Sequence, residues 1–303
     1  MPELVSVFTP TFNGETFVAE TIESVLAQTY EPIEHVLVDD GSTDGTRAIL
    51  EQYARRYPER IRVVAFDDRA GPTRRRNVAL DAASGTYLAW LDHDDIWLPE
   101  KTAKQVAALE RTPSAGFAYS QHELFDGSTG ERITTSHLRG GGDLLQRLFL
   151  EGCFFHPSTA LIRRDALARR GIRLRDSHFS WGDDHYLWLE LALDWDAVPV
   201  DEVLAQIRMH PGNESVRLAQ TNPYPWSIEL LDEFVRAHPE AVDRLGGDRR
   251  VGRGRHNALA AIYELERGRR LRAAGYALRA AALDPAGAAR YAGRRLRRAI
   301  GPT

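Results

Sequence analysis

Strand and helix patterns alternate over the first hundred of the chain's 303 residues. Short apolar runs that are typical of buried strands are separated by segments whose apolar residues recur at helical spacing. Strands are expected at residues 4–8, 35–38, 61–65 and 87–91, and helices at 18–26, 43–57 and 73–83. Strands separated by helices of this length form βαβ units. The sequence therefore predicts an α/β fold, with helices on both faces of a mixed, mainly parallel sheet.

The rest of the chain is less regular and then becomes helical. Strands are expected at residues 117–119, 158–162 and 203–209, and helices at 144–150, at 183–193 and beyond Pro223. Residues 257–300 are rich in alanine and arginine and predict two or three short helices, with breaks at Gly268 and Asp284. We expect a domain over residues 1–220 and a C-terminal helical, arginine-rich extension over residues 221–303.

Cysteine content and hydropathy indicate the compartment. Cys153 is the single cysteine, which excludes an intramolecular disulfide and a zinc site built from several cysteines. No apolar run approaches the roughly 18 residues that a membrane-spanning helix needs. The first eight residues also lack the pattern of a signal peptide. We therefore expect a cytoplasmic protein.

Charge is distributed unevenly along the chain. Residues 246–303 contain 14 arginines against four acidic residues, a net charge of +10, whereas the whole chain carries −4. Such a segment suits anionic partners such as lipid head groups or nucleic acid, or it forms a solvated helix face. Arginines near a membrane surface contribute about 1 kcal/mol each, so we expect peripheral contact at the inner membrane face and no nucleic-acid partner. The last helix, with Arg294, Arg295, Arg297 and Arg298, has few apolar residues to insert.

Polar and acidic residues follow three of the expected strands, at the edge where ligands bind in open α/β sheets. These segments are Thr9–Thr11, Asp39–Gly41 and Asp92–Asp95. Asp92, Asp94 and Asp95 would repel one another unless a cation or hydrogen bonds compensate. Carboxylate oxygens suit Mg²⁺ or Mn²⁺. The alternative is an acidic loop that caps a helix beginning near Pro99.

Four further features each allow two interpretations. Asp40 suits a hydrogen bond to a base or ribose, or a turn, and Arg74–Arg76 suit a phosphate or a solvated face. Asp183 and Asp184 follow a glycine at a helix start, which favours capping and also allows a general base. His210 suits a phosphate, a metal or a structural role. The chain has neither a G-x-G-x-x-G pattern nor a P-loop, so no dinucleotide or triphosphate cradle is predicted.

The order and spacing of several short motifs resemble those of family 2 glycosyltransferases, which have the GT-A fold. The motifs are Thr9–Asn13, Ser24–Tyr30, Val38–Asp44, Arg76–Asn77 and Leu91–Asp95. Each motif is weak alone, but the ordered set is specific. The close resemblance covers roughly the first 110 residues. A looser one runs to about residue 215 through Asp183–Leu189 and Arg208–His210.

The resemblance implies an inverting transferase that uses a nucleotide-sugar donor and Mg²⁺ or Mn²⁺. It implies that Asp92-His93-Asp94 is the DxD motif, that Asp94 is a metal ligand, and that Arg208 and His210 lie near the pyrophosphate. His210 is the second expected metal ligand. The implied donor-binding residues are Thr9, Pro10, Thr11, Asp40, Asp68, Arg76, Asp92, His93 and Arg208. The implied catalytic base is Asp184, with Asp183 as the other candidate. The family's base motif usually reads Glu-Asp where this chain has Asp-Asp, which leaves the choice open.

The resemblance also implies a substrate class, and two other functions compete with it. The donor would be a UDP-, GDP- or dTDP-linked hexose, and the acceptor a glycan or a lipid-linked molecule in polysaccharide, glycolipid or other cell-surface glycan synthesis. A nucleotidyltransferase also uses paired acids on Mg²⁺, but it needs a glycine-rich basic loop after the first strand, where this chain has Phe12-Asn13-Gly14-Glu15. A non-catalytic nucleotide or glycan binder is the third alternative, against which the retained acidic residues argue.

Overall fold

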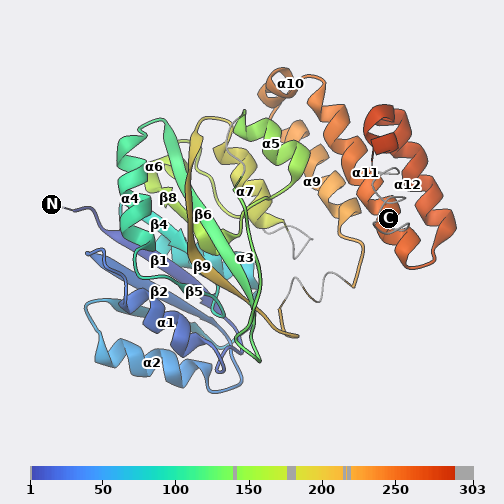
Figure 1. The fold of residues 1–303 in the computed structure, drawn as a ribbon. Helices are drawn as coiled ribbons and strands as arrows, with labels where there is room; N and C mark the ends of the chain where they lie inside the picture. The colour runs from blue at the N-terminus through green and yellow to red at the C-terminus, as the bar shows by residue number, and fades with distance from the viewer. Residues whose placement is uncertain (1, 139–141, 176–181, 214–215, 217–219, 291–303) are drawn as a thin grey trace. The chain divides into compact units, whose positions relative to one another are not determined.

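The computed structural model describes residues 2–138, 142–175, 182–213, 216 and 220–290. The chain divides into two compact units. The first comprises residues 1–141 and 155–210 and contains the sheet, whereas the second comprises residues 142–154 and 211–303 and is helical in its described part. Figure 1 follows the chain through both units. A domain boundary at residue 220 stays a prediction.

The first unit is built on one mixed sheet. Its strands are β1 (Val5–Thr11), β2 (Ile33–Asp40), β3 (Ile61–Phe66), β4 (Tyr87–Trp90), β5 (Ile96–Trp97), β6 (Ala115–Asp126), β7 (Arg132–Thr135), β8 (Ala160–Arg163) and β9 (Asp196–Met209). They lie in the order β3-β2-β1-β4-β8-β6-β9-β5, with β7 paired to β6. β1 to β4 pair in parallel, as does β6 with β9, whereas β8 and β5 pair antiparallel to their neighbours. The mixed α/β sheet expected from the sequence is confirmed.

Helices cover both faces of this sheet. They are α1 (Val18–Leu26), α2 (Thr46–Arg56), α3 (Pro72–Ala82), α4 (Lys101–Arg111), α6 (Arg164–Ala168) and α7 (Asp183–Leu191). Val7 of β1 packs in one core cluster with Val25 of α1 and Val106 of α4. Neighbouring side chains of a strand point to opposite faces. On the other face, the guanidinium of Arg76 from α3 packs on the ring of Trp90 of β4, 4.0 Å from the centre of that ring.

Three local expectations are corrected by the structure. The helix expected from residue 43 begins only at Thr46, because Gly45 is its N-cap residue and the Asp44 carboxylate accepts from the Thr46 amide at 3.0 Å. The expected strand at 158–162 begins only at residue 160, because Pro157–Thr159 forms a 3₁₀ turn, η1. The expected strands at 117–119 and 203–209 are parts of the longer β6 and β9, which pair with each other.

The second unit consists of helices in its described part. They are α5 (Leu144–Glu151), α9 (Tyr224–Ala237), α10 (Glu240–Leu245), α11 (Asp248–Glu266) and α12 (Arg270–Leu283). α11 begins earlier than the expected Asn257 and packs on α5, α9 and α12. The predicted breaks are confirmed, since Gly268 has φ 72° between α11 and α12 and Asp284 caps the end of α12. Arg294, Arg295, Arg297 and Arg298 lie outside the described residues.

Hydropathy of the helices bears on membrane insertion. Within the described ranges, none of the helices has both the length and the apolar character needed to cross a membrane.

Candidate active site

Three loops meet at the carboxyl edge of the sheet, because β1, β2 and β4 run parallel. The Asn13 amide donates to Ser42 Oγ at 3.0 Å, and Asn13 Oδ1 accepts from the Thr43 amide at 2.9 Å. Asn13 has a left-handed φ of 48°, which asparagine tolerates better than most residues. His93, from the third loop, fits against Gly14, where a Cβ would lie 2.4 Å from His93 Cδ2.

Residues 91–95 join β4 to β5 and form the loop that we call the acidic loop. Ser158 of η1 anchors this loop. Ser158 Oγ accepts from the Asp92 amide at 3.1 Å and donates to Asp95 Oδ2 at 2.6 Å. Asp95 Oδ1 accepts from the Arg208 amide at 3.1 Å. Burial raises the pKa of Asp95 well above its usual range, and repulsion from Asp94 and Asp92 raises it further. Asp95 is therefore a buried anchor of this loop.

Asp94, one residue earlier, faces His210 instead. His210 Nε2 lies 3.0 Å from Asp94 Oδ2, and its ring packs on Phe17 with centroids 4.7 Å apart. Burial raises the pKa of Asp94, but its hydrogen bond with His210 and the electrostatic influence of His93 and His210 outweigh this effect, so that the pKa falls below its ordinary value. Asp94 therefore stays anionic near neutral pH.

The spacing of Asp94 and His210 fits a divalent metal. Their ligand atoms lie 3.0 Å apart, a hydrogen-bond distance that is also compatible with adjacent ligands of an octahedral ion with bonds of about 2.1 Å, and such an ion would replace the hydrogen bond. A carboxylate beside an imidazole is a donor set that suits Mn²⁺. The donor set at the predicted metal residues therefore fits the implied cation.

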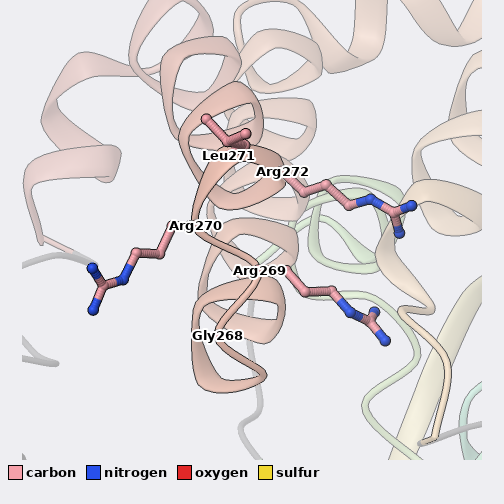
Figure 2. Close-up of a pocket in the computed structure, with 5 residues that line it drawn as sticks. All are labelled: Gly268, Arg269, Arg270, Leu271 and Arg272. Atoms are coloured by element: carbon pink, nitrogen blue, oxygen red, sulfur yellow. The ribbon is translucent and has the colours of Figure 1, made fainter.

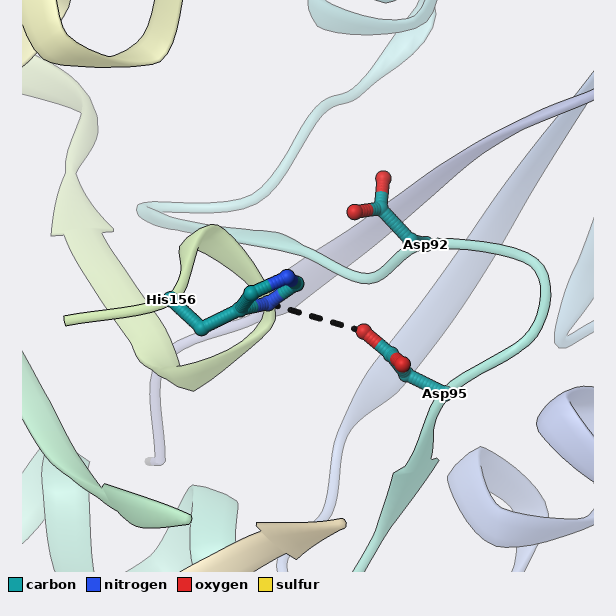
Figure 3. A group of neighbouring side chains, drawn as sticks. All are labelled: Asp92, Asp95 and His156. Carbon is teal, nitrogen blue, oxygen red and sulfur yellow. Dashed lines mark ion pairs between the residues drawn. The ribbon is translucent and has the colours of Figure 1, made fainter. Parts of the chain in front are cut away.

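A second group, Asp92, Asp95 and His156, has ligand atoms within 4.8 Å of one another (Figure 3). Its members already serve the protein's own hydrogen bonds. Asp95 is bonded through both oxygens, and His156 Nδ1 accepts from the Ser158 amide at 3.3 Å. Burial lowers the pKa of His156. This group fits a structural role better than a metal site.

The two carboxylates at the start of α7 have contrasting surroundings. Asp183 Oδ2 accepts from Thr73 Oγ1 at 2.8 Å and from Arg76 Nη1 at 2.9 Å, and Oδ1 accepts from the Asp184 amide at 3.0 Å. Asp183 is buried with both oxygens bonded. Asp184 is half-buried, and its pKa is raised to about 6, first by burial and then by repulsion from Asp183 and Asp92. Asp184 can therefore accept a proton near neutral pH.

Arg76 connects α7 with the acidic loop. Besides its bond to Asp183, its guanidinium lies 3.6 Å from Asp92 Oδ1 and packs on the ring of Trp90. Trp90 Nε1 also donates to Asp92 Oδ1 at 2.8 Å. Burial lowers the pKa of Arg76, but the charges of Asp183, Asp92 and Asp184 outweigh this effect and raise it. Arg76 therefore stays cationic between the two acidic groups.

Asp40 holds the chain segment before α3. Its Oδ1 accepts from the Ala70 amide at 2.7 Å and from Arg75 Nε at 2.6 Å, and its Oδ2 accepts from the Gly71 amide at 2.9 Å. Arg75 also donates to the carbonyl oxygen of Asp68 at 2.6 Å, while the Asp68 side chain is 81% exposed. Arg75 thus bonds to both Asp40 and Asp68, the two residues here that are predicted to bind the nucleotide-sugar donor. Contact of either residue with that substrate stays a prediction.

The end of β1 is buried. Thr9 Oγ1 lies 2.9 Å from His35 Nε2, and Thr11 Oγ1 donates to the carbonyl oxygen of Val38 at 3.2 Å. Pro10 lies between them and is also buried. The two hydroxyls thus serve bonds to β2, and nucleotide contact by these three residues stays a prediction.

Arg208 supports the acidic loop from β9. Its Nε donates to the carbonyl oxygen of Asp94 at 2.9 Å, and Nη2 donates to Glu20. The guanidinium lies 4.7 Å from the ring centres of both Phe17 and Phe125, and the residue is buried. Arg208 is fixed by these contacts, and its predicted contact with donor phosphates stays a prediction.

Sequence reasoning missed three residues that fix the acidic groups. They are Ser158, Thr73 and Trp90. Ser158 and Asp95 are 63 positions apart, and Thr73 and Asp183 are 110 positions apart, so no local pattern connects them.

Several known proteins resemble this chain in sequence. The family model described as glycosyl transferase family 2 matches residues 6–171. The chain is 43% identical over 122 residues to a putative teichuronic acid biosynthesis glycosyltransferase, TuaG, of Bacillus subtilis, a match that covers 40% of this chain and 47% of that protein. It is 31% identical to an uncharacterized glycosyltransferase of Nostoc, over 83% of this chain and 80% of that one. A third relative is the Escherichia coli enzyme WfgD, a UDP-Glc:alpha-D-GlcNAc-diphosphoundecaprenol beta-1,3-glucosyltransferase (29% identity; 77% and 87% covered).

Solved structures share the fold at low sequence identity. Staphylococcus aureus TarS (residues 1–349), in complex with UDP-GlcNAc, aligns with a TM-score of 0.62 and 18% identity over 91% of this chain and 90% of that one. The mannosyltransferase of Pyrobaculum calidifontis, in complex with GDP-Man and Mn²⁺, aligns with a TM-score of 0.60 and 20% identity over 98% and 81%. The predicted GT-A fold is thereby confirmed. With the family model matching more than half of its length, the chain belongs to glycosyltransferase family 2.

Proposed function

We propose that the protein transfers a hexose from a nucleoside diphosphate donor to an acceptor hydroxyl with inversion, with a divalent metal at the acidic loop. One observation carries the proposal: Arg76 joins the acidic loop to α7, where Asp184 has a pKa raised to about 6. This arrangement places a proton acceptor beside a group of carboxylates suited to a metal ion that would bind a diphosphate.

Asp184 is the proposed base. Asp183 already accepts three hydrogen bonds, so taking a proton would disrupt its contacts with Thr73 and Arg76. Asp184 lacks these contacts, and its raised pKa matches a base that works near neutral pH. Asp183 and Thr73 are proposed to orient the helix start that presents Asp184.

Asp94 and His210 are the residues that would hold Mg²⁺ or Mn²⁺. Such a metal, when bound, neutralises charge on the leaving nucleoside diphosphate. Asp94 suits this role because its lowered pKa keeps it anionic. Arg208, Ser158 and Asp95 keep the acidic loop in place around it. Thr9, Pro10, Thr11, Asp40, Asp68, Arg76, Asp92, His93 and Arg208 remain the proposed donor-binding set.

The proposed reaction is a single displacement. Asp184 removes the proton of the acceptor hydroxyl as that oxygen forms a bond to the anomeric carbon. The bond from the anomeric carbon to the diphosphate oxygen breaks, and its electron pair leaves with the nucleoside diphosphate. Attack from the face opposite the leaving group inverts the configuration. General base assistance of this kind is worth about 10²–10⁴-fold in rate.

The names of relatives narrow the substrates. WfgD uses UDP-Glc and a diphosphoundecaprenol-linked GlcNAc, TarS binds UDP-GlcNAc, and the mannosyltransferase binds GDP-Man. We therefore propose a UDP-linked hexose first and a GDP- or dTDP-linked one second. The proposed acceptor is a lipid-linked saccharide, in cell-surface polysaccharide synthesis at the cytoplasmic face of the membrane.

Calorimetric titration with UDP, GDP, CMP and dTDP tests the donor site. Each nucleotide is titrated with and without Mn²⁺, into the wild type and the Asp94→Ala variant. We expect one diphosphate to bind tightly, only with metal and only when Asp94 is present. Nucleotide binding that is the same with and without Mn²⁺ and in the Asp94→Ala variant would contradict the metal role. Binding without any later turnover would favour a non-catalytic binder.

Turnover and stereochemistry need a second assay. The donor sugar that matches the bound nucleotide is incubated with a polyprenyl-diphosphate-linked GlcNAc acceptor, and nucleoside diphosphate release is followed. NMR of the product then gives its anomeric configuration. A product that retains the donor's configuration would overturn the single displacement.

A further inference from the structure

Helix α12 in the second unit has an unusual solvent-facing side. It packs on α11, and Ala273 and Ala280 are its buried residues. Opposite this buried side, at spacings of four, seven and eleven residues, lie Leu271, Gly275, Leu278 and Ala282. Residues at these spacings form one stripe along a helix. The outward stripe of α12 is therefore apolar.

Two leucines dominate this stripe. Leu271 is 92% exposed and Leu278 is 73% exposed, and they are the most exposed large apolar side chains in the described part of the chain. They are seven residues apart, so they project from the same side of the helix two turns apart. Surface leucines that occur singly need no explanation, but two aligned on one helix face indicate a contact surface.

Arginines border the stripe on both sides. Arg270 lies on one flank of the helix, and Arg272 and Arg279 lie on the other. At the start of α12, a hollow of about 690 Å³ is lined by Gly268, Arg269, Arg270, Leu271 and Arg272 (Figure 2). Arg270 extends to one side of the helix there, and Arg269 and Arg272 extend to the other. Residues 268–283 contain four arginines and no acidic residue, and one of the four, Arg269, pairs with Glu264 of α11 at 3.4 Å.

We propose that this face of α12 docks on the surface of a membrane that contains anionic phospholipids. The two leucines would enter the boundary between head groups and acyl chains, while the flanking arginines would bind lipid phosphates. A second copy of the chain fits this face poorly, because two arginine-bordered stripes would repel each other. The inference concerns a surface separate from the transfer site and does not depend on the transfer reaction.

The proposal differs from the prediction made from the sequence alone. That prediction assigned membrane contact to the last helix, whose residues Arg294 to Arg298 have few apolar neighbours. α12 combines both components, apolar side chains and cations, on one described surface. Two leucines give shallow, reversible binding, which the arginines make sensitive to salt.

Vesicle flotation of the full chain tests the proposal. The vesicles are phosphatidylcholine alone, or phosphatidylcholine with phosphatidylglycerol. The variants are Leu271→Ser with Leu278→Ser, Arg270→Gln with Arg279→Gln, and the control Ile133→Ser, which changes an exposed apolar residue of β7 in the first unit. We expect binding only with phosphatidylglycerol, about tenfold weaker for the leucine pair, about fivefold weaker per arginine and unchanged for Ile133→Ser.

Several results would overturn the proposal. Equal binding by the leucine variant and the wild type would remove α12 from the interface, as would a loss confined to a variant with Arg294, Arg295, Arg297 and Arg298 changed to Gln. Equal binding to both kinds of vesicle would remove the anionic lipid. A halved mass of the leucine variant in sedimentation would assign the face to a second copy. Nucleotide titration of the same variants shows whether the donor site is intact, and so separates a loss of membrane binding from a failure of the donor site.

Discussion

The acidic loop and the start of α7 are built on the same plan. Each places two aspartates side by side and binds one of them through both of its oxygens. In the loop that residue is Asp95, held by Ser158 and the Arg208 amide. In α7 it is Asp183, held at one oxygen by Thr73 and Arg76 and at the other by the Asp184 amide. Each bound aspartate fixes the backbone that presents its neighbour, Asp94 or Asp184.

The two neighbours differ in their electrostatic surroundings. Asp94 lies beside the imidazoles of His210 and His93, which hold its pKa below the ordinary value despite burial. Asp184 has two anions nearby, Asp183 and Asp92, so that burial and repulsion raise its pKa to about 6. Environments that push carboxylates in opposite directions separate a permanent anion from a proton acceptor. One residue type thereby suits two roles.

Replacing the proposed base should have the largest effect. We expect Asp184→Asn to lower kcat by about 10²–10⁴-fold while nucleotide binding is unchanged, because the amide cannot accept the acceptor's proton. Steady-state rates and calorimetry measure the two effects. Asp183→Asn is the matched control, and a larger loss of kcat in that variant would exchange the roles of the two residues.

Replacing the permanent anion should act on metal binding. Asp94→Asn removes a proposed ligand, and we expect Mn²⁺-dependent nucleotide binding to weaken at least about 100-fold, the upper range for residues that only orient a metal ligand. Titration of nucleotide at several Mn²⁺ concentrations measures this. Glu59→Gln, which removes one exposed charge of the first unit, should have no effect. Unchanged Mn²⁺ dependence in Asp94→Asn would contradict the comparison.

Removing the anchor of the acidic loop should cost stability. Ser158→Ala deletes the donor to buried Asp95 and the acceptor of the Asp92 amide, so we expect a loss of about 1–3 kcal/mol in the free energy of unfolding. Urea denaturation measures it. The exposed Ser128→Ala serves as the control, and equal stability of the two variants would show that the loop does not depend on Ser158.

Lowering the pH should have the smallest effect on the rate, but the direction of the change is clear. Asp184 acts as a base only when it is ionised, so kcat/KM should rise with pH up to about 6 and then level off. At pH 5 we expect a rate about tenfold below the plateau. A profile recorded from pH 4.5 to 8 tests this. A rate that falls with rising pH over this range would indicate that Asp184 acts as an acid.

Much of the fold follows from local sequence patterns. The alternation of apolar runs and helical spacing in the first hundred residues predicts β1 to β4 and the helices between them, and the acidic residues at strand ends mark the site. β5 has only two residues, and residues 158 and 159 form a turn where the apolar pattern suggests a strand. Such short elements are stabilised by pairing with distant strands, which no local pattern records.

The partners of the site residues could not be predicted. Asp40, Arg208 and Asp183 match binding or catalytic motifs. Each is nevertheless fixed by a hydrogen bond to a backbone group or side chain of a residue that is remote in the chain. Choosing between Asp183 and Asp184 requires knowing that Thr73 and Arg76 bind the first. That knowledge comes from packing, because helix α3 reaches α7 only in the folded protein.

The membership of α5 in the second unit limits how the chain can be divided. Residues 142–154 pack with the later helices, although strands of the first unit precede and follow them in the chain. α5 buries Leu144, Leu145, Leu148 and Phe149, and Gly252 of α11 lies so near that a Cβ would come within 2.8 Å of Phe149. A protein truncated after His210 would keep α5 and lack the helices that cover it. Recombination between homologous genes must therefore exchange two separate stretches together, and a single crossover would inherit a mismatched core.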